Sequence, residues 1–398
     1  MRKLQILLFV SFILLITGGF VLFSESVKSQ ETLKVGGLFD LTGVTSEVGK
    51  PFAQGVRDAV DWVNQQGGIN GKQIELIPVD YSYKIPQAVA AYKKFVSQDK
   101  VLLINGWGTG DTEALRADVN KDKIPYISAS FSAHLTDPSK TPYNFFVGAD
   151  YSTELRIFLK WIKDNWKDTS RNPRVAFIYS DNPYGKAPIE AGRAYAKEIG
   201  VDLVDEEIVP PSFQDSTSQL LNMQKKEPDF AYINTTTSWV AIILKDARKL
   251  GLKTQFGMNP YGFGEKLPQI AKEAAEGAYG MMPNVAYGEN VPMMKTIQDY
   301  VEKNKTIENP DTLYVRGWAY VLVWSEALRR TQEFTGPGVK AALETLRDFD
   351  TGGLTPPITF TPEDHRPTMR CKIYQVQNGK IVPIAELELP RKKEWLGL

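Results

Sequence analysis

The sequence predicts an α/β protein made of two similar halves, each a parallel β-sheet covered by helices. Two observations support this prediction: β-type runs alternate with helical periods from Leu33 onward, and the same alternation restarts at Arg174. The length agrees, because 398 residues exceed the roughly 250–300 at which single cores usually stop growing. Strands that alternate with helices in this way are typical of a parallel sheet with helices on both faces.

The first half is expected to begin with a strand at 33–39 and a helix whose apolar residues recur every three or four positions from Phe52 to Val63. Strands and helices then alternate until a long amphipathic helix closes this half. The elements are a strand at 72–79, a helix marked by Ala88 and Val96, a strand at 101–104, a helix at 111–119, a strand at 125–128 and a helix from Leu155 to Trp166.

The second half repeats the pattern, and the C-terminal third adds helices and a hairpin without starting another domain. Its expected elements are strands at 174–179, 201–209 and 229–234, helices at 186–199, 216–226 and 239–250, later helices at 293–303, 313–329 and 337–346, and hairpin strands at 372–376 and 381–385. Two such halves in series leave a cleft at the carboxyl ends of their strands, where open sheets bind ligands.

The composition favours binding over catalysis. With one cysteine, Cys371, and two histidines, His134 and His365, neither a disulfide framework nor a cysteine- or histidine-rich metal site can form within one chain. The 47 basic and 47 acidic residues balance, so no basic footprint indicates a nucleic acid. No GxSxG elbow occurs, and both histidines lie in polar loops. We therefore expect neither an enzyme nor a cofactor.

The N-terminus has the layout of a secretory signal peptide. Arg2 and Lys3 precede an apolar run at 6–23 and a polar stretch at 24–30. We expect residues 1–29 to be a signal peptide, with cleavage before Gln30 and export of the rest. The alternative is an uncleaved membrane anchor, because the run of about 18 residues is close to the spanning minimum of roughly 17.

Five strings, in order along the chain, resemble those of the type I periplasmic solute-binding proteins that take up branched-chain amino acids and amides. They are VGGLFDLTG at 35–43, GGINGK at 67–72, Tyr184-Gly185, DARKLGLKTQF at 246–256 and AEG at 275–277. The resemblance covers nearly the whole mature chain. It implies two Rossmann-like lobes with parallel sheets, linked by three crossover strands, that close on a small ligand.

The resemblance also implies the boundaries of the lobes and the partner of the protein. Lobe one would combine 31–150 with 281–357, and lobe two would combine 151–280 with 358–398. The protein would be a monomer in the periplasm that delivers its ligand to an ABC permease in the membrane. The same pair of lobes serving a membrane receptor as a ligand sensor is the alternative.

A candidate carboxylate site follows two neighbouring strands. NGWGTGDT at 105–112 ends a strand and opens a helix, whose N–H groups and dipole suit an anion. A simple tight turn is the alternative, whereas a nucleotide loop is excluded because neither GxGxxG nor GxxxxGK[ST] is present. The resemblance implies that Thr109, together with Ser130 and Ser132 of the next loop, holds the carboxylate of a ligand.

Aromatic residues are expected to form the walls of the cleft. Trp107 and Phe131 lie inside the two hydroxyl-rich loops, and the resemblance implies that Tyr184 reaches across from lobe two. For Trp107 and Tyr184 the alternative is packing within their own lobes. Val48 stands where the family often has an aromatic contact, and Tyr314 matches a pocket aromatic but lies on a helical stripe that favours core packing.

Two departures from the family concern lobe two. Family members that bind amino acids carry an acid there that pairs with the ammonium, whereas the matching stretch MNPYG, at 258–262, has Tyr261 or Pro260 in that position. A family aromatic is replaced by three threonines around Thr236. A buried, unpaired ammonium is unfavourable by several kcal/mol, so the ligand is open between a branched-chain amino acid and an aromatic carboxylate or amide.

Three charged residues bear on that choice. Asp181 or Asp111 would substitute for the missing acid if the ligand has an ammonium. Arg316, in an apolar helical stretch, is either a buried countercharge to an anionic ligand or, as we favour, part of an ion pair at the surface or between helices. The expected ligand-binding residues are Trp107, Thr109, Ser130, Phe131, Ser132, Tyr184, Thr236 and Tyr261.

Overall fold

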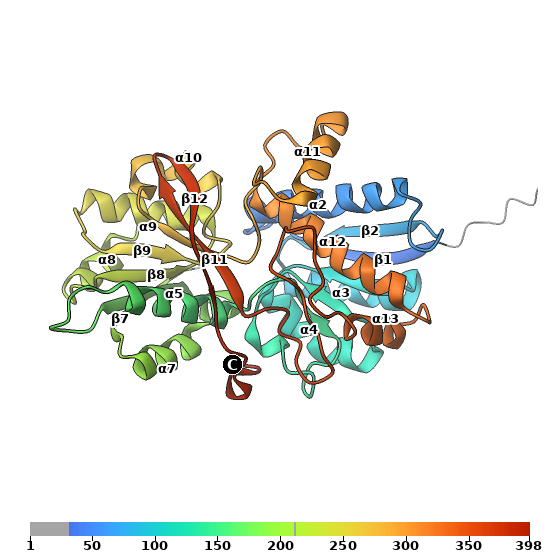
Figure 1. Ribbon diagram of the computed structural model, residues 1–398, viewed down its shortest axis with the longest axis horizontal. Coiled ribbons are helices and arrows are strands. Elements are labelled where there is room, and N and C mark those ends of the chain that lie inside the picture. The colour runs from blue at the N-terminus through green and yellow to red at the C-terminus, as the bar shows by residue number, and fades with distance from the viewer. Residues whose placement is uncertain (1–31, 211) are drawn as a thin grey trace, which may run out of the picture. The chain divides into compact units, whose positions relative to one another are not determined.

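The computed structural model describes residues 32–210 and 212–398, and in this part of the chain the strands form two separate sheets (Figure 1). The signal peptide expected at 1–29 lies outside the described residues. Among the helices that are described, none combines the length and apolar character that crossing a membrane requires.

The first described sheet contains five parallel strands in the order β2-β1-β3-β4-β5, joined by helices. Its strands are nearly continuous apolar runs because helices cover both faces. The elements are β1 (Leu33–Phe39), α2 (Ser46–Gln65), β2 (Ile74–Asp80), α3 (Ile85–Lys94) with a π-helical turn at Phe95–Asp99, β3 (Leu103–Gly106), α4 (Thr109–Asp122), β4 (Tyr126–Ser128), a 3₁₀ turn at Ala133–Leu135 and β5 (Asn144–Phe145).

The second described sheet has seven strands in the order β12-β11-β10-β9-β8-β6-β7. Strands β6 to β10 are parallel, whereas β11 and β12 form the antiparallel hairpin expected at the C-terminus. The elements are α5 (Tyr151–Asn165), β6 (Arg174–Ser180), α6 (Pro183–Lys186), α7 (Ile189–Ile199), β7 (Asp202–Val209), α8 (Thr217–Gln224), β8 (Phe230–Asn234), α9 (Thr237–Lys249), β9 (Gln255–Met258), α10 (Lys266–Ala271), a 3₁₀ turn at Lys272–Ala275, β10 (Tyr279–Met282), β11 (Arg370–Gln377), β12 (Lys380–Glu388) and a 3₁₀ turn at Lys393–Trp395.

The chain crosses between the two sheets at three places in the described residues. It leaves the first sheet after β5, returns after β10 and leaves again before β11. The returning segment forms α11 (Pro292–Asn304), α12 (Thr312–Arg330) and α13 (Gly336–Leu343), and its apolar side chains join the core of the first sheet. We call the first sheet with these helices lobe one, and the second sheet with its own helices lobe two. The predicted α/β fold with two lobes is confirmed.

Two departures from the expected elements have local causes. The helix expected at 186–199 is divided into α6 and α7 around Pro188, which has no N–H to continue the helix. The second sheet is not purely parallel, because the C-terminal hairpin adds to the edge at β10. The sequence patterns do not predict the two-residue β5.

Helices α2 and α12 cross at two glycines in the core of lobe one (Figure 1). A Cβ atom on Gly55 would lie 2.1 Å from the carbonyl oxygen of Tyr314, and one on Gly317 would lie 2.4 Å from that of Phe52. Only glycine permits this approach of the two backbones. The crossing holds the start of α2 in a fixed position relative to α12.

Gly317→Ala is expected to lower the free energy of unfolding by roughly 1–3 kcal/mol, because the added methyl group forces the two helices apart. Urea denaturation measures the change. Gly110→Ala is the matched control, since a Cβ atom at Gly110 would lie 3.7 Å from its nearest neighbour, Ile85, and should cause no loss of stability. Equal stability of the Gly317→Ala variant and the unaltered protein would contradict the crossing described here.

Candidate ligand-binding cleft

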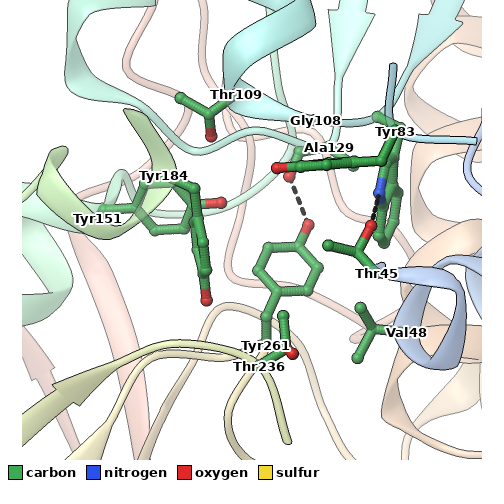
Figure 2. A pocket seen from close by; sticks show the side chains of 11 residues that line it. Thr45, Val48, Tyr83, Gly108, Thr109, Ala129, Tyr151, Tyr184, Thr236 and Tyr261 are labelled. Atoms are coloured by element: carbon green, nitrogen blue, oxygen red, sulfur yellow. Dashed lines mark hydrogen bonds between the residues drawn. The ribbon is translucent and has the colours of Figure 1, made fainter. Parts of the chain in front are cut away.

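A narrow cleft lies where the carboxyl ends of strands from both sheets face each other (Figure 2). Each lining residue comes from a segment that follows a strand of one of the two sheets, as the topology of open α/β sheets predicts. Lobe one contributes Thr45, Val48, Tyr83, Trp107, Gly108, Thr109 and Ala129, and lobe two contributes Tyr151, Tyr184, Thr236 and Tyr261.

On the lobe-one side of the cleft, the indole of Trp107 is surrounded by hydroxyl groups. Trp107 is buried, and its Nε1 donates a hydrogen bond of 2.9 Å to the hydroxyl of Thr45. The Thr45 hydroxyl in turn donates to the buried carboxylate of Asp40, at 2.6 Å. The indole ring contacts Phe52 at 5.2 Å and Tyr261 at 5.6 Å between centroids. Trp107 therefore belongs to both the core of lobe one and the wall of the cleft.

The start of α4 opens at the cleft. Its N-cap is Gly108, which has no side chain, and the Asp111 carboxylate accepts from the backbone N–H groups of Gly108 and Asp111. The hydroxyl of Thr109, in that first turn, lies 2.7 Å from the hydroxyl of Ser130. This arrangement presents backbone donors, a helix dipole and a hydroxyl group to the cleft.

Five of the eight predicted binding residues line the cleft, and three lie behind its wall. Trp107, Thr109, Tyr184, Thr236 and Tyr261 line it, whereas Ser130, Phe131 and Ser132 do not. Ser130 contacts Thr109, and the hydroxyl of Ser132 turns to Glu113 at 3.3 Å. Phe131 is fully buried and stacks on the ring of Tyr261, 5.9 Å between centroids. In this loop only Ala129 reaches the cleft.

Tyr261 crosses the cleft from lobe two. Its hydroxyl donates a hydrogen bond to the main-chain carbonyl of Ala129 in lobe one, as Figure 2 shows. The side chain of Asn259 holds the loop in place, because its oxygen accepts from the N–H of Tyr261 at 2.7 Å and from the hydroxyl of Tyr184 at 2.7 Å. Burial raises the pKa of Tyr261 to about 12, with the guanidinium of Arg316 opposing the shift, so its hydroxyl keeps its proton at neutral pH.

Glu47, in the first turn of α2, connects the lobes at the edge of the cleft. Its carboxylate accepts hydrogen bonds of 3.0 Å from the Thr236 hydroxyl and from the backbone N–H of Ser238. The hydroxyl of Ser238 also donates to it, and Lys266 lies 3.5 Å away. Thr236 and Ser238 stand at the start of α9, where the helix dipole favours an anion. The sequence patterns did not single out Glu47, because its partners lie almost 190 residues away.

Neither of the two acids considered as partners for a ligand ammonium lines the cleft. Asp181 is exposed and pairs with Lys186. Asp111 is buried, and its carboxylate accepts from the hydroxyls of Tyr81 at 2.7 Å and Tyr126 at 3.4 Å. Burial raises the pKa of Asp111 to about 7, although these hydrogen bonds pull it in the opposite direction.

The ion pair favoured for Arg316 is wrong. Arg316 is 1% exposed, and its Nε donates to the side-chain oxygen of Asn284 at 2.9 Å. Its guanidinium lies 4.7 Å from the ring centroid of Tyr261, and no carboxylate among the described residues forms a salt bridge with it. Tyr314 lies in the core, as its helical stripe predicts, with its hydroxyl on Asp58 at 2.7 Å. Within the described ranges, no group of three or more His, Cys, Asp or Glu side chains is arranged to hold a metal ion.

Two α/β lobes, three crossings and a cleft at the carboxyl ends of both sheets define a two-lobed ligand-binding protein. Comparison with known families identifies which one: the Periplasmic binding protein family matches residues 32–380, so the chain belongs to that family of extracytoplasmic proteins. The predicted resemblance to type I members related to leucine, isoleucine and valine binding is confirmed.

Individual relatives agree with this assignment. The chain is similar to the leucine-specific-binding protein of Salmonella typhimurium, with 27% identity over 81% of this chain and 84% of the relative. An ABC transporter substrate-binding protein of Aeropyrum pernix is 30% identical, with coverage of 92% and 98% and a TM-score of 0.85. A branched-chain amino acid ABC transporter protein of Thermus thermophilus, solved with bound valine, is 25% identical, with coverage of 90% and 96% and a TM-score of 0.83. The chain is thus a substrate-binding protein of ABC transporters, and these relatives are solute-binding proteins.

Proposed function

We propose that this protein captures a small carboxylate-bearing ligand outside the cytoplasm by closure of its two lobes, and delivers it to the permease of an ABC importer. The observation that supports the proposal is the start of α4, which opens into the cleft with Gly108 as its N-cap and the hydroxyl of Thr109 beside it. Backbone N–H groups at a helix start, together with the helix dipole, stabilise an anion.

The charges around α4 are compatible with an anionic ligand. Asp111 lies in the same first turn and would repel a carboxylate if it were ionised. Its raised pKa of about 7 keeps much of it protonated below neutral pH, and its carboxyl group is engaged with Tyr81. The guanidinium of Arg316 lies against the ring of Tyr261 and interacts with the buried carboxyl group of Glu154 without a salt bridge. Its charge favours a negative group in the cleft, whereas the carboxylates of Glu47 and Asp40 at the edge oppose one.

The cleft is nearly closed. The space left between its walls, about 20 Å³, has room for about one water molecule, so a ligand enters only when the lobes open. Aromatic rings from both lobes enclose this space, including Trp107, Tyr184 and Tyr261. This lining of aromatic rings and hydroxyl groups suits a molecule with one carboxylate and a compact apolar body, such as a branched-chain amino acid or an aromatic acid.

Closure is supported by contacts that join the lobes. Glu47 and Ala129 of lobe one accept hydrogen bonds from Ser238 and Tyr261 of lobe two. We place the lobe boundaries at 31–150 with 281–357 for lobe one and at 151–280 with 358–398 for lobe two. We also propose that residues 1–29 are a removable export signal and that the mature protein is a monomer in the periplasm.

Small-angle scattering with a panel of amino acids and other small carboxylates tests closure, since the bound ligand should reduce the radius of gyration. Thr109→Val is expected to weaken binding about tenfold in calorimetric titrations, because it removes one hydrogen-bonding hydroxyl at the carboxylate position. Thr254→Val is the control, since that hydroxyl bonds the carbonyl of Pro228 in lobe two, outside the cleft. A ligand that binds without compaction, or with equal affinity to Thr109→Val, would refute the proposal.

A further inference from the structure

The cleft offers polar groups but no charged side chain among the described residues that line it. Its polar groups are hydroxyls and main-chain atoms, such as those of Thr109, Tyr184 and Ala129. A carboxylate can be held by N–H and O–H donors alone, whereas a buried ammonium needs an anion or several well-placed acceptors. The lining can therefore bind the carboxylate of an amino acid but offers no anionic partner to its ammonium.

The acceptor that an ammonium would need is already in use. The carbonyl of Ala129 faces the cleft, and the hydroxyl of Tyr261 donates to it. Tyr261 keeps this proton at neutral pH, because its pKa is about 12. The hydroxyl of Tyr184 is likewise directed to Asn259. A carbonyl oxygen has two lone pairs, so an ammonium entering the cleft would have to share the Ala129 carbonyl with the Tyr261 hydroxyl or displace that hydroxyl.

Three acids around the cleft are engaged elsewhere, and a fourth, Glu154, is fully buried behind the wall, where burial raises its pKa well above the usual value and so favours its neutral form. Asp40 accepts from the N–H groups of Gly43, at 2.6 Å, and Thr45, at 2.9 Å. Asp111 is bonded to tyrosine hydroxyls, and Glu47 holds the start of α9.

A buried positive charge also lies behind the cleft. The guanidinium of Arg316 lies 4.7 Å from the centroid of the Tyr261 ring, and its Nη1 has no hydrogen-bond partner although the side chain is 1% exposed. Its charge attracts a carboxylate and repels an ammonium.

We propose that the cleft selects carboxylates that lack an α-ammonium group, and that Tyr261 is the residue that excludes the ammonium. The inference rests on the proposed function, because it assumes that the ligand carries a carboxylate. The class of ligand is a small aliphatic or aromatic monocarboxylate, and Tyr261 determines specificity by occupying the carbonyl of Ala129.

Matched pairs of ligands that differ only in the amino group test this inference. Calorimetric titration of the whole protein compares 4-methylpentanoate with L-leucine, 3-methylbutanoate with L-valine, and 3-phenylpropanoate with L-phenylalanine. At least one deaminated acid should bind, and its amino acid partner should bind at least about 100-fold more weakly, because its ammonium has no anionic partner. An amino acid that binds as tightly as its deaminated partner would overturn the inference.

Substitutions of Tyr261 identify the residue responsible. Tyr261→Phe frees the Ala129 carbonyl, so the affinity ratio of the deaminated acid to its amino acid should fall about tenfold. Tyr261→Glu supplies an anion to the ammonium and should lower this ratio further. Tyr184→Phe is the matched control: its hydroxyl contacts lobe two only, so it should change both affinities by the same factor. A thermal melt verifies that each variant is folded. If Tyr261→Glu does not fold, the affinity ratio of Tyr261→Phe alone shows whether Tyr261 determines specificity.

The outcomes separate this inference from the function on which it rests. An unchanged ratio in Tyr261→Phe would overturn the role of Tyr261. Binding of amino acids alone would overturn the inference and leave the proposed carboxylate ligand standing. Failure of every acid and every amino acid to bind would overturn the proposed carboxylate ligand, and the inference with it.

Discussion

Glu47→Ala is expected to weaken ligand binding by roughly 30- to 150-fold. The Glu47 carboxylate joins lobe one to the start of α9 through Thr236, Ser238 and the nearby Lys266. One hydrogen bond to a charged acceptor contributes about 1.5–3 kcal/mol, and because the freed groups of Thr236 and Ser238 can bond water instead, losing the set should destabilise the closed form by about 2–3 kcal/mol. Because the ligand binds the closed form, its apparent affinity falls with the population of that form. Calorimetric titration measures the change.

Two further variants show whether the effect comes from the contact between the lobes. Ser238→Ala removes one of the partners and should produce part of the loss, with coupling to Glu47→Ala in a double-mutant cycle. Glu75→Ala should leave the affinity unchanged, since its carboxylate accepts from Thr32 within lobe one. If Glu47→Ala binds the ligand as tightly as the unaltered protein, the Glu47 contact does not stabilise closure.

Asp111→Asn is expected to raise the free energy of unfolding by about 4 kcal/mol above pH 8 and to have little effect near pH 4. Burial raises the pKa of Asp111 from 3.8 to about 7 in the folded protein. The unfolded chain therefore loses this proton first, and stability falls as the pH rises from about 4 to about 7. The asparagine has no proton to lose and can still bond Tyr81 and Tyr126.

Urea denaturation at several pH values measures the difference between the two proteins. Glu265, whose pKa burial also raises to about 7, retains part of the pH dependence in the variant. The exposed Asp299 provides a control, since Asp299→Asn should change stability by less than about 0.5 kcal/mol at any pH. A gain from Asp111→Asn that is equal at pH 4 and pH 8 would contradict the assignment.

The elements that the sequence predicted best are those with long, regular patterns. Helix α2 repeats its apolar residues over five turns, and β1 is a continuous buried run, so both could be recognised without tertiary information. β5 has only two residues and α10 only six, which is too short for a period to show. Their conformations depend on neighbours that are distant in sequence.

The residues of the candidate site also differ in how well the sequence predicts them. Residues that directly follow strands, such as Trp107 and Tyr261, could be placed at the cleft because parallel strands all end at one edge. Which side chain of a loop points inward could not be predicted, so Phe131 was expected in the cleft but packs behind it. Glu47 and Asn259 act through contacts across the fold, and no local pattern marks such contacts.

The glycine crossing of α2 and α12 has a consequence for how the molecule opens. With its 20 residues, α2 is roughly 30 Å long, and its joint with α12 lies near its middle, at Gly55. Glu47 stands near one end of α2, and Arg316 on α12 donates to the carbonyl of Pro260 in lobe two. The contacts that Glu47 and Arg316 make with lobe two are therefore both carried by one tightly packed pair of helices, α2 and α12. A displacement at the glycine crossing would therefore alter both of these contacts, whereas the contact between Tyr261 and Ala129 does not depend on it.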